Sequence, residues 1–198
     1  MMYRYLLLSG LGLVLSEPGM AQQPFTSSKK NKNSGLFNIT QIGYNRGLGN
    51  ARFRPDVVIP NRGYVARLRT TFGYFVSPHT SVGLGFGLDG YHNPGYNTAP
   101  LVADVRYYQR PTENSVFFGA NTGYSLKLGP AFQRGVIGSA NAGYRLILGR
   151  ATHMLFSAGL DLHQIRDARI LVLTPTTFEM VESTIWLTSA SFNAGLLF

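Results

Sequence analysis

The feature that most constrains how this chain can fold is the alternation of apolar and other residues along most of its length. Segment 81–91, SVGLGFGLDGY, is the clearest case, because Val82, Leu84, Phe86 and Leu88 fall on one face and the positions between them are mostly glycine. A repeat of two residues is the period of a β-strand, in which successive side chains point to opposite faces. From residue 36 onward this period recurs and no convincing helical period does, so the sequence predicts an all-β chain.

Eight segments share the pattern, each with one apolar and one polar face: 36–46, 64–76, 81–91, 101–108, 115–126, 136–148, 153–163 and 185–198. Segment 36–46 alternates less regularly, which suggests a bulge or a register that the pattern does not fix. A soluble sheet also alternates. The polar face here, however, carries Gly, Asn, Ser and isolated Asp and Arg, not the Lys, Glu and Thr of a solvated surface. Strands of about ten residues with one apolar face are what a transmembrane β-barrel requires.

The connections between these segments alternate in length. The second, fourth and sixth are short (77–80, 110–114 and 149–152), and the others are mostly longer (47–62, 92–100, 127–135 and 165–183). Outer-membrane barrels have short periplasmic turns and longer extracellular loops. The sequence therefore predicts an eight-stranded antiparallel transmembrane β-barrel over 36–198. Tyr64, Tyr74, Tyr124 and Tyr144 fall on its lipid face, where they are candidates for the interfacial girdles.

The N-terminal region predicts export. Residues 1–21 combine a short basic start, the apolar run Tyr5–Leu15 and small residues before Ala21, which is the pattern of a secretory signal peptide. The apolar run is too short for a spanning helix, which needs about 20 residues. Residues 22–35 are polar and basic, and we expect a flexible periplasmic tail. The expected location is the outer membrane of a Gram-negative cell.

Three stretches carry a resemblance to known proteins: SVGLGFGLDGY, APLVADVRYYQRPTENSVFFGANTGYSL and GSANAGYRLIL. They resemble the small eight-stranded outer-membrane barrels of OmpA/OmpX type, and more closely the outer-membrane β-barrel domain proteins of the Bacteroidetes group. The C-terminal FNAGLLF resembles the assembly signal of outer-membrane proteins, with Leu196 and Phe198 at the signal positions. This resemblance implies the outer-membrane assembly machinery as a partner and names no reaction.

Gly85, Gly87 and Gly90 have the spacing of a dinucleotide-binding fingerprint. That fingerprint requires a turn from a strand into a helix, whose N-terminus holds the pyrophosphate. Here the glycines lie in one alternating strand, and the residues from Tyr91 onward read as a loop. We therefore expect Gly83, Gly85 and Gly87 to point inward and leave room for long side chains, and we expect no nucleotide site.

The inward face of the predicted barrel carries an unusual set of charged residues: Arg67, Arg69, Asp89, Asp104, Arg106, Arg145, Asp161 and His163. An eight-stranded barrel is just wide enough for side chains to fill it, and charges removed from water must be paired. The main hypothesis is a polar network that plugs the lumen of a structural or interaction protein. A narrow path lined by the excess arginine, as in a small porin-like channel or transport component, is the alternative.

Catalysis and bound cofactors are not expected. Ser157, Asp161 and His163 share one strand face, but neighbours two residues apart on a strand are roughly 6–7 Å apart, and this set points inward and away from lipid. A lipid-A-modifying enzyme is therefore the least favoured alternative. The four histidines have no metal-ligand spacing, and the chain has no cysteine.

The net charge is +9, which in an exported protein favours an anionic partner outside the cytoplasm. Export makes nucleic acid an implausible partner, and anionic lipid headgroups or polysaccharide fit better. Arg52, Arg54 and Arg62 of the first long loop are candidates to contact the phosphates of outer-membrane lipopolysaccharide. Segment 165–183 is a candidate edge for a protein partner. The oligomeric state is left open.

Overall fold

The computed structural model describes residues 33–54, 57–92, 95–149, 151–173 and 178–198. The predicted signal peptide and most of the predicted tail lie outside these residues. The described chain contains ten strands: β1 (Gly35–Leu48), β2 (Asn50–Arg54), β3 (Val57–Pro60), β4 (Tyr64–Phe75), β5 (Thr80–His92), β6 (Asn97–Tyr108), β7 (Ser115–Leu126), β8 (Gly135–Ile147), β9 (His153–Leu173) and β10 (Phe178–Leu197).

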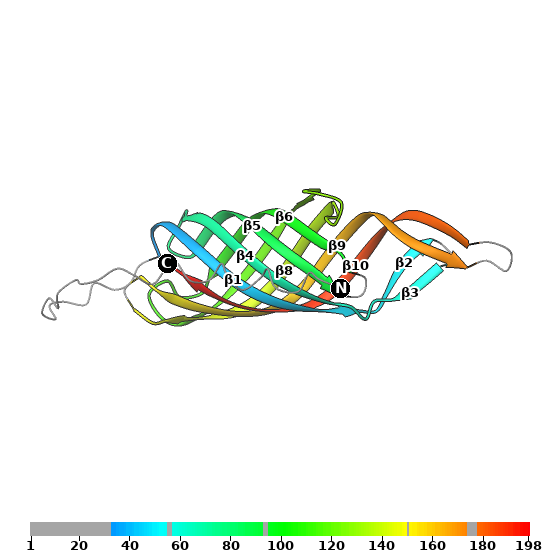
Figure 1. Cartoon of the computed structure of the whole chain (residues 1–198). Helices are drawn as coiled ribbons and strands as arrows, with labels where there is room; N and C mark the ends of the chain where they lie inside the picture. Colours follow the sequence, from blue (N-terminus) through cyan, green and yellow to red (C-terminus); the bar gives the residue numbers. More distant parts are fainter. Residues whose placement is uncertain (1–32, 55–56, 93–94, 150, 174–177) are drawn as a thin grey trace, which may run out of the picture.

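Eight of the strands form a closed antiparallel barrel in the order β1-β10-β9-β8-β7-β6-β5-β4, which confirms the predicted fold class (Figure 1). The barrel closes where β1 pairs with β10, and the Asn38 and Phe198 backbones exchange two hydrogen bonds of 3.0 and 2.9 Å there. The start of β1 and the end of the chain therefore lie at one end of the barrel, together with the short turns. We call this the turn end and the opposite end the loop end.

The sequence pattern suggests a bulge in segment 36–46 or a register that it does not fix, and within the barrel β1 contains no bulge. Its residues pair without interruption with both β4 and β10. The alternation is irregular because Phe37 and Ile39 point into the barrel, while Asn38 and Thr40 point outward. Phe37 and Ile39 belong to a buried apolar cluster inside the barrel. In this part of β1 the apolar side chains therefore face the lumen and the polar ones face outward.

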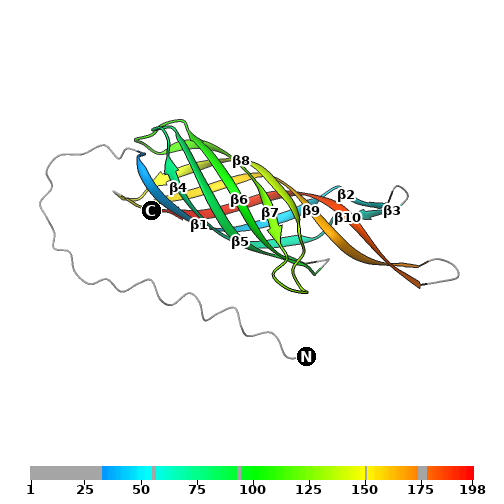
Figure 2. The same ribbon diagram turned by 90° about the horizontal axis from the view of Figure 1, so that it is seen from above.

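At the loop end, much of the sequence predicted to form connections belongs to the strands instead. The connection between β5 and β6 is only residues 93–96, because both strands extend past the predicted boundaries and Tyr91 lies within β5. Segment 165–183 is mainly the continuation of β9 and β10, which pair from Ser183 with Ala168 to Phe178 with Leu173. Figures 1 and 2 show this hairpin and the β2–β3 hairpin extending beyond the barrel, away from the C-terminus.

A small apolar cluster supports the extended hairpins. It consists of Ala51, Ile165, Ala168, Ile185 and Leu187, with Tyr91 and Tyr96 packed against it. The cluster therefore joins β2, β9 and β10 over the loop end of the barrel.

The outer face of the barrel is a broad apolar belt. Large apolar side chains are exposed on every barrel strand, and Phe72 and Leu84 are 68% and 66% exposed. The outward tyrosines Tyr64 and Tyr74 lie ten positions apart on β4. At about 3.3 Å per residue and a strand tilt near 40°, this distance corresponds to a belt about 25 Å tall, which is the height of the apolar band of outer-membrane barrels.

Tyr124 and Tyr144 are also exposed, as predicted for girdle residues. Among the described residues there is no helix that is long and apolar enough to cross a membrane.

Candidate functional site: the barrel lumen

All eight residues predicted to line the lumen are buried inside the barrel, and none is more than 7% exposed. They come from strands β4, β5, β6, β8 and β9, whose alternation turns every second residue inward. The lumen therefore holds four arginines and three aspartates that are removed from bulk water.

Arg67 connects opposite walls of the barrel. Its Nε donates to Asp89 Oδ1 at 3.0 Å on the neighbouring strand β5, and its NH1 donates to Asp161 Oδ1 at 2.7 Å on β9. The side chain of Arg67 is 5% exposed and that of Asp89 is fully buried. Gly43 on β1 leaves room for the neighbouring Asn193, because a Cβ at Gly43 would collide with the Asn193 amide oxygen, whereas its distance of 3.5 Å to Arg67 Cβ would be an ordinary contact.

Two further arginines reach from the wall toward other strands. Arg106 on β6 is held by Asp104, with Nε to Oδ1 at 2.8 Å, and its NH2 donates to Gln41 Oε1 on β1 at 3.2 Å. Arg69 on β4 donates through NH1 to Asn121 Oδ1 on β7 at 3.4 Å. These links join strands that are not neighbours in the barrel, so each of them crosses the lumen.

Arg69 is the least completely paired of the three arginines that reach across the lumen. The nearest carboxylate oxygen in the ion pairs of the described chain is Asp89 Oδ2, at 3.9 Å. Within the described residues, Nε and NH2 of Arg69 have no hydrogen-bond partner. Arg69 is therefore the feature that most favours the channel alternative.

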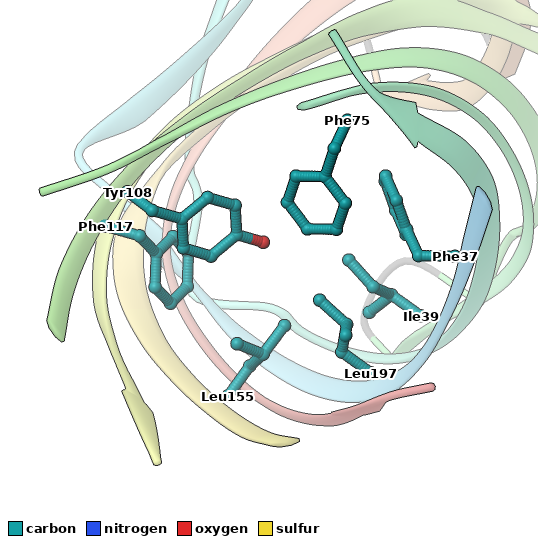
Figure 3. Close-up of a cluster of buried hydrophobic side chains, with 7 residues drawn as sticks. All are labelled: Phe37, Ile39, Phe75, Tyr108, Phe117, Leu155 and Leu197. Carbon is teal, nitrogen blue, oxygen red and sulfur yellow. The ribbon is translucent and has the colours of Figure 1, made fainter. Parts of the chain in front are cut away.

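An apolar cluster lies in the lumen at the turn end. Phe37, Ile39, Phe75, Tyr108, Phe117, Leu155 and Leu197 are all buried and converge on the barrel axis (Figure 3). The rings of Phe37 and Phe75 are 4.9 Å apart, and those of Tyr108 and Phe117 are 5.7 Å apart. An aqueous path along the barrel axis would meet this cluster. Sequence reasoning missed it because its apolar members occupy inward positions, on the face that alternation assigns as polar.

Arg145 caps the cluster on its outer side. Its guanidinium lies 4.7 Å from the centre of the Tyr108 ring and donates to the backbone carbonyls of Arg110 and Glu113 at 2.7 and 2.9 Å. It also donates to Asn33 Oδ1 at 2.5 Å, while Asn33 Nδ2 donates to the Pro78 carbonyl at 2.8 Å. Asn33, two residues before β1, is thus held at the turn-end mouth of the barrel.

His163 forms a second cluster near the loop end. Its Nε2 lies 3.1 Å from Ser125 Oγ on β7, and its Nδ1 is hydrogen-bonded to the Tyr91 hydroxyl on β5. Ser125 is fully buried. Tyr91 was missed as a lumen residue because it was assigned to a loop, and the continued alternation through Gly90 and Tyr91 was the available signal.

The three residues weighed as a catalytic set are not bonded to one another in the described hydrogen bonds. Ser157 accepts from Asn193 at 3.4 Å, Asp161 accepts from Arg67, and His163 bonds to Ser125 and Tyr91. Among the described residues, no three His, Cys, Asp or Glu side chains are grouped so that they could hold a metal ion.

The loop arginines are only partly described. Arg52 and Arg54 belong to β2, but their side chains lie outside the described part of the chain. Arg62 is exposed between β3 and β4.

Comparison with known proteins identifies the fold. No protein-family model matches the sequence, and no curated protein matches it. Among solved structures, the outer membrane protein OprG from Pseudomonas aeruginosa has a TM-score of 0.50 at 11% identity, covering 85% of this chain and 97% of OprG. Neisserial surface protein A has a TM-score of 0.49 at 13% identity, covering 83% of this chain and 96% of that one. The fold is that of the small outer-membrane barrels, and at these identities the likeness is to the fold alone.

Proposed function

We propose that this protein is an integral outer-membrane β-barrel of structural or interaction type, with a lumen that is packed with side chains and does not conduct. The observation that carries the proposal is the apolar cluster at the turn end, whose side chains converge on the barrel axis (Figure 3). The crossing links of Arg67 and Arg106 support it, because they tie opposite walls together inside the lumen.

A small channel is the second candidate, and the incompletely paired Arg69 favours it. We expect planar-bilayer recordings of the purified barrel to show no stable conductance steps, since the apolar cluster excludes hydrated ions. The control is the same preparation carrying Arg106→Ala, which also should not conduct while the cluster is intact. Reproducible anion-selective steps in the natural protein that disappear in Arg106→Ala would overturn the proposal and favour a channel.

Lipid-A modification is the remaining candidate, and the Ser125–His163 pair is the observation in its favour, because a serine beside a histidine nitrogen is a nucleophile–base geometry. Complete burial of Ser125 weighs against it, since a lipid substrate would have to enter the lumen. Mass spectrometry of lipid A from cells with and without the protein tests this candidate. An unchanged acyl pattern is expected, and a changed pattern would overturn the proposal.

The same proposal includes export through the signal peptide 1–21, insertion by the outer-membrane assembly machinery through Phe198, and membership in the Bacteroidetes-type barrel family. The exposed apolar belt supports membrane insertion, because a belt of this extent in water would drive aggregation. Membrane fractionation followed by gel migration with and without heating tests it. Recovery of the folded chain in the soluble fraction without detergent would refute it.

A further inference from the structure

An aromatic ladder runs across the outer face of β1, β4 and β5 near the loop end. The rings of Tyr44 and Tyr64 stack with centroids 5.9 Å apart, and those of Tyr64 and His92 stack at 4.6 Å. Tyr44 and Tyr64 are 47% and 37% exposed. Rings with a polar edge in this position lie at the boundary between the apolar belt and the headgroups.

Two arginines lie directly beyond the ladder on the same outer face. Arg46 is the register partner of Tyr64. The backbone pairing continues beyond them, because Gly47 N donates a hydrogen bond to Gly63 O at 2.9 Å. Arg62 is therefore a diagonal neighbour of Arg46 across these two segments, a relation that places residues roughly 7–8 Å apart on a sheet.

Within the described part of the chain, no acidic side chain pairs with either guanidinium group. Asn61 packs against the inner side of Gly47, so the next residue, Arg62, points outward. Arg46 and Arg62 are exposed. Arginine binds phosphate oxygens through two parallel N–H donors, so a pair of arginines at headgroup level favours a phosphorylated lipid.

An apolar groove of about 600 Å³ lies on the outer face of β1, β10 and β9, and its lining residue Tyr44 is two positions from Arg46 on the same face of β1. Its outward lining residues are Ile42, Tyr44, Phe156, Ala158, Phe192 and Ala194. The register explains the hollow: Tyr44 pairs with Phe192 and then Ala158, while Ile42 pairs with Ala194 and then Phe156. The two alanines form a low floor between rings, and this shape suits one hydrocarbon chain.

We propose that Arg46, Arg62, the Tyr44 ring and this groove form a binding site for one acylated, phosphorylated glycolipid of the outer leaflet. The arginines hold a sugar phosphate, and the groove holds one acyl chain. This inference rests on the proposed outer-membrane location, because only there does the loop end face a leaflet built from such glycolipids.

The test is native mass spectrometry of the full-length barrel in detergent micelles, titrated with an acylated, bisphosphorylated glucosamine disaccharide. We expect saturable binding of one molecule, at least tenfold weaker binding in the Arg46→Ala/Arg62→Ala variant, and at least threefold weaker binding in Ala158→Phe, where the ring fills the groove. The dephosphorylated glycolipid should bind the natural protein about as weakly as the bisphosphorylated one binds the double variant.

Two matched controls make the result specific. Arg110→Ala removes an exposed arginine at the turn end, and Ala103→Phe adds the same ring on the outer face of β6, away from the groove; both should bind like the natural protein. Unchanged affinity in the double variant would overturn the site, as would equally tight binding of phosphatidylglycerol or occupation of the groove by a second copy of the chain. Every variant is first shown to be heat-modifiable, so a loss of binding in a folded barrel is separated from a failure of the barrel itself.

Discussion

Gly85→Leu is expected to prevent most of the chain from reaching the folded, heat-modifiable barrel. Gly85 points inward from β5, and even a Cβ there would lie 2.6 Å from Thr71 Oγ1 and 3.0 Å from Val102 Cγ2. Leucine adds three more carbons to a space that the walls already fill. Overpacking a close-packed interior typically costs about 1–3 kcal/mol, and we expect a cost at the upper end or beyond it because a closed barrel cannot widen at one level.

Gly90→Leu is the matched control for this experiment. Gly90 lies in the same strand but on the outer face, and the nearest atom to a Cβ there is Asn97 Oδ1 at 3.7 Å. The measurement is the fraction of refolded protein that migrates as the compact form on an unheated gel. Equal folding of the two variants would contradict a packing role for Gly85, and binding of a dinucleotide to the natural protein would revive the fingerprint interpretation.

Asp89→Ala is expected to lower the free energy of unfolding by about 3 kcal/mol or more. Asp89 accepts from Arg67 and is the nearest carboxylate to Arg69, so its removal leaves one guanidinium with only Asp161 and another with no carboxylate. Removing one partner of a buried pair typically costs about 3–5 kcal/mol, because the remaining charge stays out of water. Urea titration of the barrel refolded in lipid vesicles measures the change.

Glu113→Ala supplies the comparison. Glu113 also pairs with an arginine, Arg110, but both side chains are about two-thirds exposed, at 65% and 66%. Exposed pairs typically contribute about 0–1 kcal/mol, so this variant should unfold almost like the natural protein. Similar losses in the two variants would mean that the charges at Asp89 are solvated, and a water-filled lumen would then replace the packed one.

The sequence alone predicts which residues face the lumen, because a strand's side-chain period is a local property. Once one residue of β4 or β5 is assigned to a face, the rest of that strand follows, and the burial of Arg67, Arg69 and Asp89 agrees with the assignment. Strand β1 shows where this reasoning weakens. Phe37 and Ile39 are apolar and face inward, so hydrophobicity alone gives the wrong face for them.

The tertiary structure decides which of the inward residues meet. The contact of Arg67 with Asp161 joins residues 94 positions apart on strands that are not paired, and it depends on the stagger of all eight strands around the closed barrel. The same holds for the apolar cluster at the turn end, for the Ser125–His163 contact, and for the groove beside Arg46. Alternation fixes the direction of a side chain relative to its own strand, whereas its partner across the lumen is fixed only when the barrel closes.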